Sequence, residues 1–240
     1  MTALLDVSVI LPSLLLKDDL LRCIYSIRAA FKEQLQYEII VVVPDLDGFV
    51  ELTGADIQIV PQQQSGIYAA MNEGVNNAKG NYLYFIGQDD VMLGEAAKAM
   101  KQGITESSDL ILANVFWGSS GVFKNNASRS SLVWRNWCHQ GLFYKRERFV
   151  KDIEFFPVQF IAQADHYVNI VFSGLSELRV TKYNGCIAYY SGDGFSAKQP
   201  DMVFRKSFPA IVYKHFGVLS YLMVILRRIV LGASNSLLKN

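Results

Sequence analysis

The sequence has little net charge, which limits the kinds of partner it can bind. Over 240 residues, 23 Lys and Arg side chains nearly balance 22 Asp and Glu side chains, and the formal net charge is +1. A protein that binds nucleic acid through phosphates carries a basic surface, so no nucleic-acid partner is expected. An anionic ligand would have to be held by a local site.

Cysteines and several common catalytic motifs are scarce or missing. Cys23, Cys138 and Cys186 are odd in number, widely spaced and without a CxxC pair, so reduced thiols in a cytoplasmic protein are favoured over disulfides or structural zinc. The N-terminus lacks the basic segment and cleavage site of a secretion signal. GxGxxG, GxxxxGK[ST] and GxSxG motifs are absent, which argues against NAD enzymes, P-loop kinases and serine hydrolases.

What is present is a regular alternation of apolar segments. Hydrophobic residues make up 51% of the sequence, enough for the core of one large α/β domain. The pattern predicts a mostly parallel sheet with helices on both faces and a ligand site at the carboxyl ends of the strands. Strands are expected at residues 7–11, 38–43, 57–60, 82–86 and 110–116, and helices at 17–32, 67–79 (closed by Gly80) and 95–102.

The alternation weakens after Trp117. Residues 118–131 are rich in Ser, Gly and Asn, which predicts an exposed loop. A smaller β-rich portion should follow, with a helix near residues 165–172 and strands near 178–190.

An apolar segment near the C-terminus is far shorter than the ~20 residues that span a bilayer. Residues 218–226 are almost wholly apolar, and Arg227 and Arg228 then interrupt them. Two interpretations stay open: a helix packed on the protein's own core, or an interfacial helix whose basic residues, with Lys214 and Lys239, face anionic lipid headgroups. At helical spacing one face collects Leu219, Leu222, Met223, Leu226, Ile229 and Val230.

Two adjacent carboxylates, Asp89 and Asp90, directly follow the strand expected at residues 82–86. In open α/β sheets such a strand end faces the ligand crevice. Carboxylates suit Mg²⁺ or Mn²⁺, which shares its coordination with phosphates and can neutralise a departing diphosphate. A solvated turn is the plainer alternative, because Asp is common after strands.

The segment SGIYAAMNEGVNNAKGNYLYFIGQDD, residues 65–90, resembles the signature of glycosyltransferase family 2. There, a GIYDAMN-like helix leads through A-x-G-x-Y into a strand that ends in an acidic DxD-type motif. The resemblance implies a GT-A fold, a metal ion at Asp90 and the ribose or sugar of the donor at Asp89. It also implies donor contacts from Gly66, Tyr68, Met71 and Asn72.

The chain departs from this signature at three positions, which bear on the identity of the donor. Gln88 stands where a strict DxD has its first acid, and Ser65 and Ala69 stand where acids are frequent.

The first half of the chain resembles the same family more loosely. The strand that ends at Pro12 resembles part of the family's nucleotide-binding half, and an acid after the second strand would hold the nucleobase. Asp45 is favoured over Asp47 for that role, with an Asp-rich turn as an equal alternative.

Later segments extend the resemblance. CHQGLFY implies that His139 and Gln140 contact the diphosphate or the acceptor, although a lone histidine is more often structural. The family places its catalytic base at Asp165, where a carboxylate would take the proton of the acceptor hydroxyl. Capping of the following helix is the alternative for Asp165. A glycine–serine loop at residues 190–198 would approach a phosphate or sugar.

The resemblance implies an inverting glycosyltransferase of the bacterial polysaccharide, O-antigen or capsule type. A UDP-sugar would be its donor, Mn²⁺ or Mg²⁺ its cofactor and a lipid-linked glycan its acceptor, in the cytoplasm or on the inner face of the membrane. Residues 1–117 would then form the nucleotide-sugar half, 118–202 the acceptor half and 203–240 an amphipathic helix. The alternatives are a nucleotidyltransferase, which would need a glycine-rich basic signature where LPSLLLKDD stands, and a non-catalytic sugar-binding protein.

Overall fold

A computed structural model describes residues 5–192 and 200–237, and within these ranges nine strands form one sheet. They are β1 (Val7–Pro12), β2 (Tyr37–Val43), β3 (Ile57–Pro61), β4 (Tyr82–Phe85), β5 (Val91–Met92), β6 (Leu110–Trp117), β7 (Val122–Phe123), β8 (Leu142–Lys145) and β9 (Val180–Tyr190). Their order is β3-β2-β1-β4-β8-β6-β9-β5, and β7 pairs with β6.

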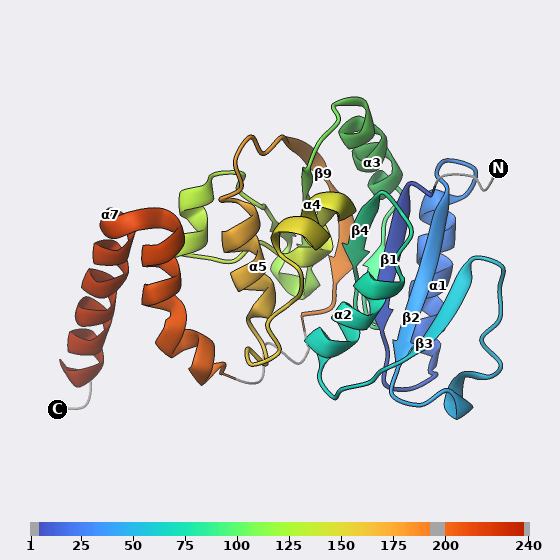
Figure 1. Cartoon of the computed structure of the whole chain (residues 1–240), viewed down its shortest axis with the longest axis horizontal. Helices are drawn as coiled ribbons and strands as arrows, with labels where there is room; N and C mark the ends of the chain where they lie inside the picture. The colour runs from blue at the N-terminus through green and yellow to red at the C-terminus, as the bar shows by residue number, and fades with distance from the viewer. Residues whose placement is uncertain (1–4, 193–199, 238–240) are drawn as a thin grey trace.

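Helices cover both faces of this sheet, as the sequence predicts (Figure 1). Helices α1 (Asp18–Phe31) and α3 (Glu95–Thr105) pack on one face, while α2 (Ile67–Asn77), α4 (Arg146–Asp152) and α5 (Ala164–Phe172) pack on the other. The helix α7 (Met202–Leu237) projects beyond α5 at the end of the molecule far from β3. The short 3-10 helices are η1 (Asp47–Phe49), η2 (Gly118–Ser120), η3 (Arg129–Val133) and η4 (His139–Gly141).

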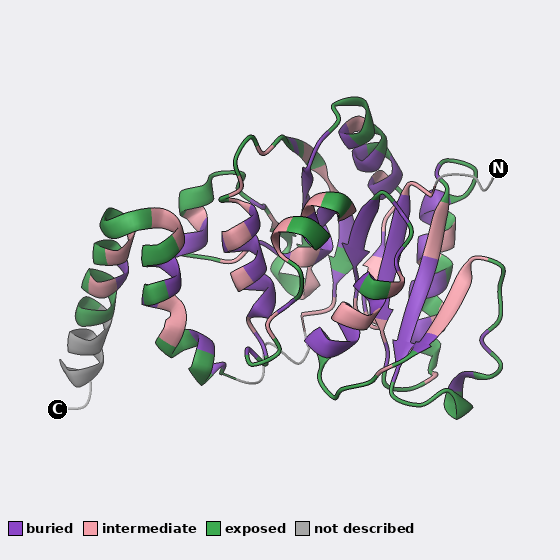
Figure 2. Ribbon diagram, viewed as in Figure 1, coloured by how far each residue is buried: buried purple, intermediate pink, exposed green. Residues whose placement is uncertain are grey.

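The central strands are hydrophobic along their whole length because both of their faces are covered. In β1, Val9 and Leu11 face α1 and α3, whereas Ile10 between them faces α2. Figure 2 shows these strands and the inward faces of the helices as buried. The core therefore has two layers, one on each side of the sheet.

The expected parallel arrangement holds for β3, β2, β1 and β4, which pair in parallel throughout. The carboxyl ends of β1, β2 and β4 consequently meet at one edge. Beyond β4 the sheet becomes mixed, because β8 runs antiparallel to both β4 and β6. The sequence analysis missed β8, which lies outside the strand–helix alternation that revealed the earlier strands.

The prediction that Gly80 closes the helix at residues 67–79 is wrong. Helix α2 ends at Asn77, and Gly80 lies against β1, where its N–H donates to Ser8 Oγ at 2.8 Å. A Cβ at this position would stand 2.4 Å from the backbone nitrogen of Ser8. The residue is small because two backbone segments approach each other here.

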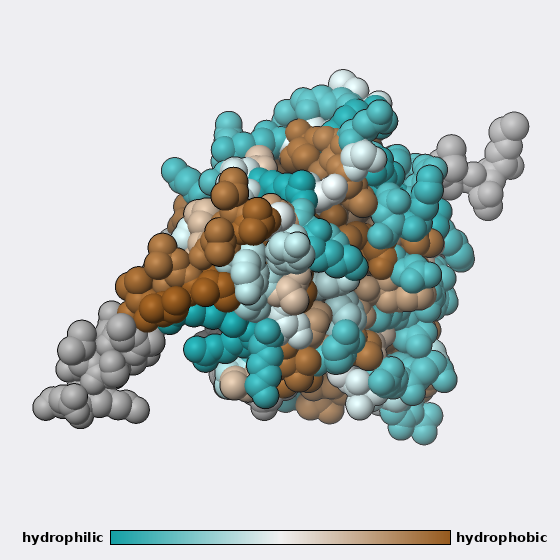
Figure 3. Space-filling model, turned by 60° about the vertical axis from the view of Figure 1, so that its left-hand side comes forward, coloured by the Kyte–Doolittle hydropathy of each residue, from teal (hydrophilic) through white to brown (hydrophobic). Residues whose placement is uncertain are grey.

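The C-terminal helix is kinked at Gly217, where φ is 81°. By length and composition alone, Met202–Val230 could cross a membrane. The second segment nevertheless buries Val224 against Val133 and Val212 of the protein itself. The apolar face identified in the sequence points the other way, with Leu219 75% and Leu226 63% exposed, and forms a hydrophobic patch on the surface (Figure 3).

Candidate active site

A cavity of about 320 Å³ lies at the carboxyl ends of β1 and β4. It extends to η4 and to the start of α5, so it joins segments that are far apart in the sequence. The expected site residues that line it are Pro12, Tyr68, Met71, Asp89, Asp90, His139, Gln140 and Asp165.

Three expected donor-binding residues do not line this cavity. Asp45 is exposed after β2, and its Oδ1 accepts the backbone N–H of Asp47 at 3.1 Å, as in an Asp-rich turn. Asn72 uses both ends of its amide on the backbone of Phe156, at 2.9 and 2.8 Å, and so fastens α2 to the segment before α5. Gly66 precedes α2 with φ at 111°, a conformation that favours glycine.

Asp90 is buried at the end of β4, and the protein saturates most of its carboxylate. Oδ2 accepts the Gly87 N–H at 3.1 Å and the Gln140 Nε2–H at 2.8 Å, while Oδ1 accepts the backbone N–H of Ser191 at 3.0 Å. Burial raises the pKa of Asp90 to about 6, against the opposing effect of these hydrogen bonds. Since a carboxylate oxygen has two lone pairs, Oδ1 keeps one for a further partner.

Asp89 is more exposed to solvent than Asp90, and Ser191 also holds it. Its Oδ2 accepts the hydroxyl of Ser191 at 2.6 Å. Gln88, which replaces the first acid of DxD, has turned to the protein: its Oε1 accepts Ser13 Oγ at 2.7 Å and the Leu14 N–H at 3.2 Å. The departure at Gln88 therefore fastens the loop after β1 to the end of β4.

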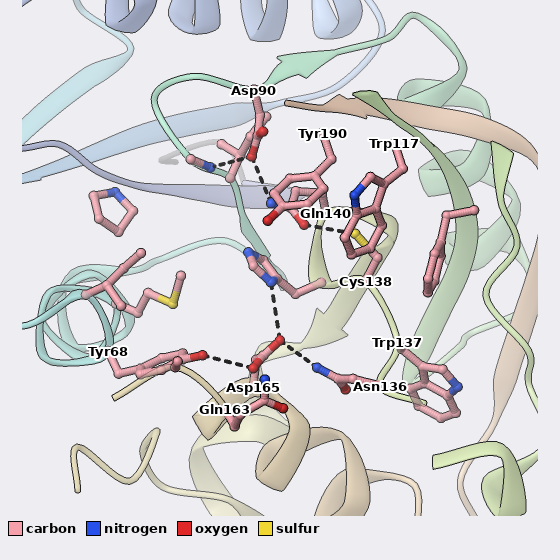
Figure 4. Close-up of a pocket in the computed structure, with 18 of the residues that line it drawn as sticks. Tyr68, Asp90, Trp117, Asn136, Trp137, Cys138, Gln140, Gln163, Asp165 and Tyr190 are labelled. Carbon is pink, nitrogen blue, oxygen red and sulfur yellow. Dashed lines mark hydrogen bonds and ion pairs between the residues drawn. The ribbon is translucent and has the colours of Figure 1, made fainter. Parts of the chain in front are cut away.

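Asp165 lies across the cavity from Asp90 in the first turn of α5 (Figure 4). Tyr68 OH donates to its Oδ1 at 2.9 Å, and Asn136 Nδ2 donates to its Oδ2 at 2.7 Å. The ring nitrogen Nδ1 of His139 lies 3.5 Å from the same Oδ2. Oδ1 thus retains one lone pair.

The surroundings of Asp165 keep it ionised. Burial alone raises its pKa, but the hydrogen bond and charge of His139 and the hydrogen bond from Tyr68 outweigh burial. The net result is a pKa below the usual value, so the group is a carboxylate at neutral pH. Helix α5 receives no side-chain cap, and the carboxylate of Asp165 bonds to side chains of other elements.

Residues 8–164, more than half of the chain, match the sequence model of the family described as "Glycosyl transferase family 2". The chain belongs to glycosyl transferase family 2.

Curated relatives of this family 2 protein are glycosyltransferases from mycobacteria. It is 35% identical over 106 residues to proteins named "PGL/p-HBAD biosynthesis glycosyltransferase" from Mycobacterium tuberculosis and Mycobacterium bovis. That match covers 42% of this chain and 41% of theirs, so the chain aligns with less than half the length of these curated relatives.

Solved structures show that the family 2 protein has the GT-A fold. S. aureus TarS 1-349 in complex with UDP-GlcNAc matches 86% of this chain and 65% of its own, with a TM-score of 0.68 and 16% identity. A mannosyltransferase of Pyrobaculum calidifontis in complex with GDP-Man and Mn²⁺ matches 90% of this chain and 64% of its own, with a TM-score of 0.59 and 14% identity.

The carboxylates of this family 2 protein fit only one kind of metal site. Among the residues that the structure describes, no group of three or more His, Cys, Asp or Glu side chains could enclose a metal ion. Asp89 and Asp90 supply two carboxylates, which is what Mg²⁺ commonly takes from a protein when phosphates and water complete its shell. The donor set therefore fits a cation shared with a diphosphate.

Sequence analysis assigned no role to two residues of the family 2 protein that hold the carboxylates of the cavity. Asn136 holds Asp165, and Ser191 holds both Asp89 and Asp90. Ser191 does lie in the glycine–serine segment singled out in the sequence, of which residues 193–199 are outside the described residues. Aromatic side chains form a second group in the cavity: Trp117, Phe123 and Trp137 were not foreseen, whereas Tyr190 begins the segment singled out at residues 190–198.

Proposed function

We propose that this family 2 protein transfers a sugar from a nucleotide-diphospho-sugar to a hydroxyl group of a glycan, with inversion at the anomeric carbon. One observation carries the proposal: a single cavity presents Asp89 and Asp90 at a strand end and the ionised Asp165 across from them. The two kinds of task in glycosyl transfer, holding the diphosphate and activating the acceptor, would then fall to separate carboxylates.

Asp165 would act as the general base. Its Oδ1, which retains a lone pair, would take the proton as the acceptor oxygen attacks the anomeric carbon and the bond to the diphosphate breaks. Tyr68, Asn136 and His139 would hold the carboxylate in one orientation through that step.

Asp89 and Asp90 would hold Mn²⁺ or Mg²⁺ together with the donor diphosphate. The cation, when bound, supplies positive charge against the negative charge of the leaving diphosphate. Ser191 and Gln140 would keep the two carboxylates directed to the cavity. The open lone pair of Asp90 Oδ1 makes that oxygen the candidate ligand.

The donor would lie along the side of the cavity formed by the ends of β1 and β4 and by α2. Pro12, Tyr68 and Met71 line that side, and Gly66 and Asn72 shape α2 behind it. Asp45, exposed after β2 at the same edge of the sheet, is the candidate for the nucleobase. Among solved relatives, complexes with UDP-GlcNAc and GDP-Man support a nucleotide-sugar, and we favour a UDP-sugar.

These assignments divide the chain into a donor-binding part, an acceptor-binding part and a membrane-contacting part. Residues 1–117 would bind the nucleotide-sugar and 118–202 the acceptor, which we take to be a lipid-linked glycan of a bacterial polysaccharide, O-antigen or capsule. Residues 203–240 would rest on the cytoplasmic membrane from its inner side. The exposed apolar face of α7 and its lack of acidic residues between positions 202 and 237 support that location.

Binding and turnover assays with two matched variants test the proposal. Wild-type protein is expected to gain thermal stability with UDP-sugars and Mn²⁺, because a ligand of the native state raises the unfolding temperature. Asp90→Asn should lose the Mn²⁺-dependent part of this shift. Asp165→Asn should keep the shift and lose sugar transfer by at least about 100-fold.

The same assays separate the alternatives. A nucleotidyltransferase would release pyrophosphate from a nucleoside triphosphate, and a sugar-binding protein without activity would bind the donor but never turn it over. Normal transfer by Asp165→Asn would refute the assignment of the base. No stabilisation by any UDP-, GDP- or dTDP-sugar, with or without Mn²⁺, would refute the transferase itself.

A further inference from the structure

An aromatic wall stands in the cavity, formed by Trp117, Phe123 and Tyr190, which come from the ends of β6, β7 and β9. In Figure 4, Trp117 and Tyr190 stand together beside the space between Asp90 and Asp165, on the side away from Tyr68. None of these rings takes part in the base and cation roles proposed above. Their function in the cavity therefore remains to be assigned.

The sheet itself gathers the three rings on one face. Strand β6 pairs with β7 and β9, and Trp117 is in register with Tyr190 while Val115 is in register with Phe123. Val115 and Trp117 are two residues apart and share a face, so the Phe123 ring lies diagonally across from Trp117. The intervening Phe116 points to the other face and is 41% exposed.

Neighbouring groups fix the wall in place. The ring centroids of Trp117 and Phe123 are 5.0 Å apart, and those of Trp117 and Tyr190 are 4.7 Å apart at an interplanar angle of 84°. The Arg135 guanidinium carbon lies 4.1 Å from the centroid of Phe123, and its Nη2 donates to the carbonyl of Lys124 at 2.8 Å. A ligand would thus meet a preformed surface and would not have to order it.

The position of the wall restricts what it can bind. An apolar ligand would leave the buried carboxylate of Asp165 without a partner for its open lone pair, which is costly. Away from the cation proposed at Asp89 and Asp90, a strongly anionic ligand would be repelled by the ionised Asp165. A pyranose ring satisfies both conditions, because it has a C–H face for the aromatic rings and hydroxyl groups at its edge for a carboxylate.

We propose that the ring wall of Trp117, Phe123 and Tyr190 is the platform for the acceptor's sugar ring. The C–H face of the pyranose stacks on Trp117, and the hydroxyl to be glycosylated points to Asp165. The acceptor is assigned here because the donor belongs on the opposite side, with Pro12 and Met71. This role rests on the proposed transferase function, whereas the binding of a pyranoside to the wall can be measured independently of it.

Ligand-observed NMR titrations test the platform without any turnover. The probes are methyl β-D-glucopyranoside, methyl α-D-mannopyranoside and N-acetylglucosamine, with open-chain sorbitol as the ringless control. Wild type should bind at least one pyranoside saturably and sorbitol not at all. Trp117→Ala should weaken that binding about tenfold, and Trp117→Phe, which keeps a ring, much less.

Phe116→Ala is the matched control, since it removes a ring from the adjacent position on the opposite face of β6. It should bind pyranosides like the wild type. Saturable sorbitol binding, the absence of any pyranoside binding to the wild type, or equal binding by wild type and Trp117→Ala would each overturn the platform. Thermal unfolding of each variant identifies loss of the fold. If Trp117→Ala unfolds, Trp117→Leu, which keeps an apolar side chain without a ring, replaces it and should show the same weakening.

Donor turnover separates this proposal from the proposed function. UDP release from a UDP-sugar with water as acceptor should stay within about twofold of the wild type in Phe116→Ala, and in Trp117→Ala it should fall less than pyranoside binding does. Failure of the wild type to bind any UDP-sugar would refute the transferase function. The pyranoside titration would still test the aromatic wall independently. If Trp117→Ala loses UDP-sugar hydrolysis as severely as pyranoside binding, the wall serves the donor and the acceptor assignment is wrong.

Discussion

Tyr68 is the residue that joins the family signature to the candidate base. It comes from α2, and its hydroxyl donates to Asp165 across 97 positions of sequence. This bond favours the ionised form of Asp165 and helps to hold its pKa below the usual value. In the proposed reaction, the signature helix would therefore act on the acceptor side as well as on the donor side.

Tyr68→Phe should shift the pH dependence of transfer in a defined direction. Loss of the hydrogen bond raises the pKa of Asp165, and a base must be deprotonated to act, so activity should be lost at a higher pH as the solution is acidified. The acidic limb of the kcat/KM profile should move upward, while activity above neutral pH changes little. Tyr25→Phe, at an exposed position of α1, is the control. Superimposable profiles would show that Asp165 is not the titrating base.

Cys138 is a second residue whose role emerges only from its contacts. Its thiol donates to Gln140 Oε1 at 3.0 Å, which turns the amide so that Nε2 donates to Asp90. Burial raises the pKa of Cys138, so the thiol keeps the proton it donates. If Asp90 holds the cation as proposed, Gln140 is an outer partner of that ligand, and Cys138→Ala, which frees Gln140 to turn, should weaken Mn²⁺-dependent UDP binding by up to about tenfold.

Cys138→Ser retains a donor and should bind UDP and Mn²⁺ nearly as the wild type does. Cys186→Ala, a change at a partly exposed thiol outside the cavity, should have no effect. Calorimetric titration measures all three variants. Equal affinity of Cys138→Ala and wild type would show that Gln140 keeps its orientation without the thiol.

Among the elements, the contact between the end of α2 and β1 sets the position of the signature strand. Gly80→Ala would bring a Cβ within 2.4 Å of the Ser8 nitrogen and 2.5 Å of the Val7 carbonyl carbon, and backbone atoms cannot move aside cheaply. We expect a loss of about 1–3 kcal/mol in the free energy of unfolding, measured by urea denaturation. Gly48→Ala, where a Cβ meets open space, should change stability by less than ~0.5 kcal/mol. Equal stability of the two variants would contradict the close approach.

Elements with a clear period were predictable, and those without one were not. The strands β1, β2, β3, β4 and β6 appeared in the sequence as apolar runs, and the helices α1, α2 and α3 as apolar residues at helix spacing between them. The strand β8 and the short helix η4 lie outside this alternation, yet η4 carries His139 and Gln140 to the cavity.

The candidate site likewise contains residues that the sequence predicted and residues that it did not. The carboxylates could be located because a strand end, an acid pair and a family motif coincide in the sequence. The aromatic wall could not, since it depends on which strands become neighbours, and the pairing of β6 with β9 joins residues about 70 positions apart. Asn136 could not either, because it lies in a loop and its partner Asp165 is in α5. Sequence spacing contains no record of that pairing.

At the scale of the whole molecule, α7 contacts the segment that leads into the cavity and exposes an apolar face. Arg227 Nη1 donates to the carbonyl of Trp134 at 3.5 Å, and the next residue along the chain, Arg135, lines the cavity. Residues 202–237 contain five basic residues and no acidic one, which favours a surface with anionic lipids.

Two substitutions on that face should release the protein from membranes. In Leu222→Asp/Leu226→Asp, charges replace side chains that are mostly exposed, and Val224, the buried contact of the same segment, is untouched. Sedimentation with vesicles of phosphatidylglycerol and phosphatidylcholine should pellet the wild type but not this variant. Val50→Asp, an equally exposed apolar position far along the chain, is the control and should pellet normally. Pelleting of the double variant would mean that this apolar face does not hold the protein on the bilayer. Equally strong binding of the wild type to phosphatidylcholine alone would mean that the basic residues do not direct it to anionic lipid.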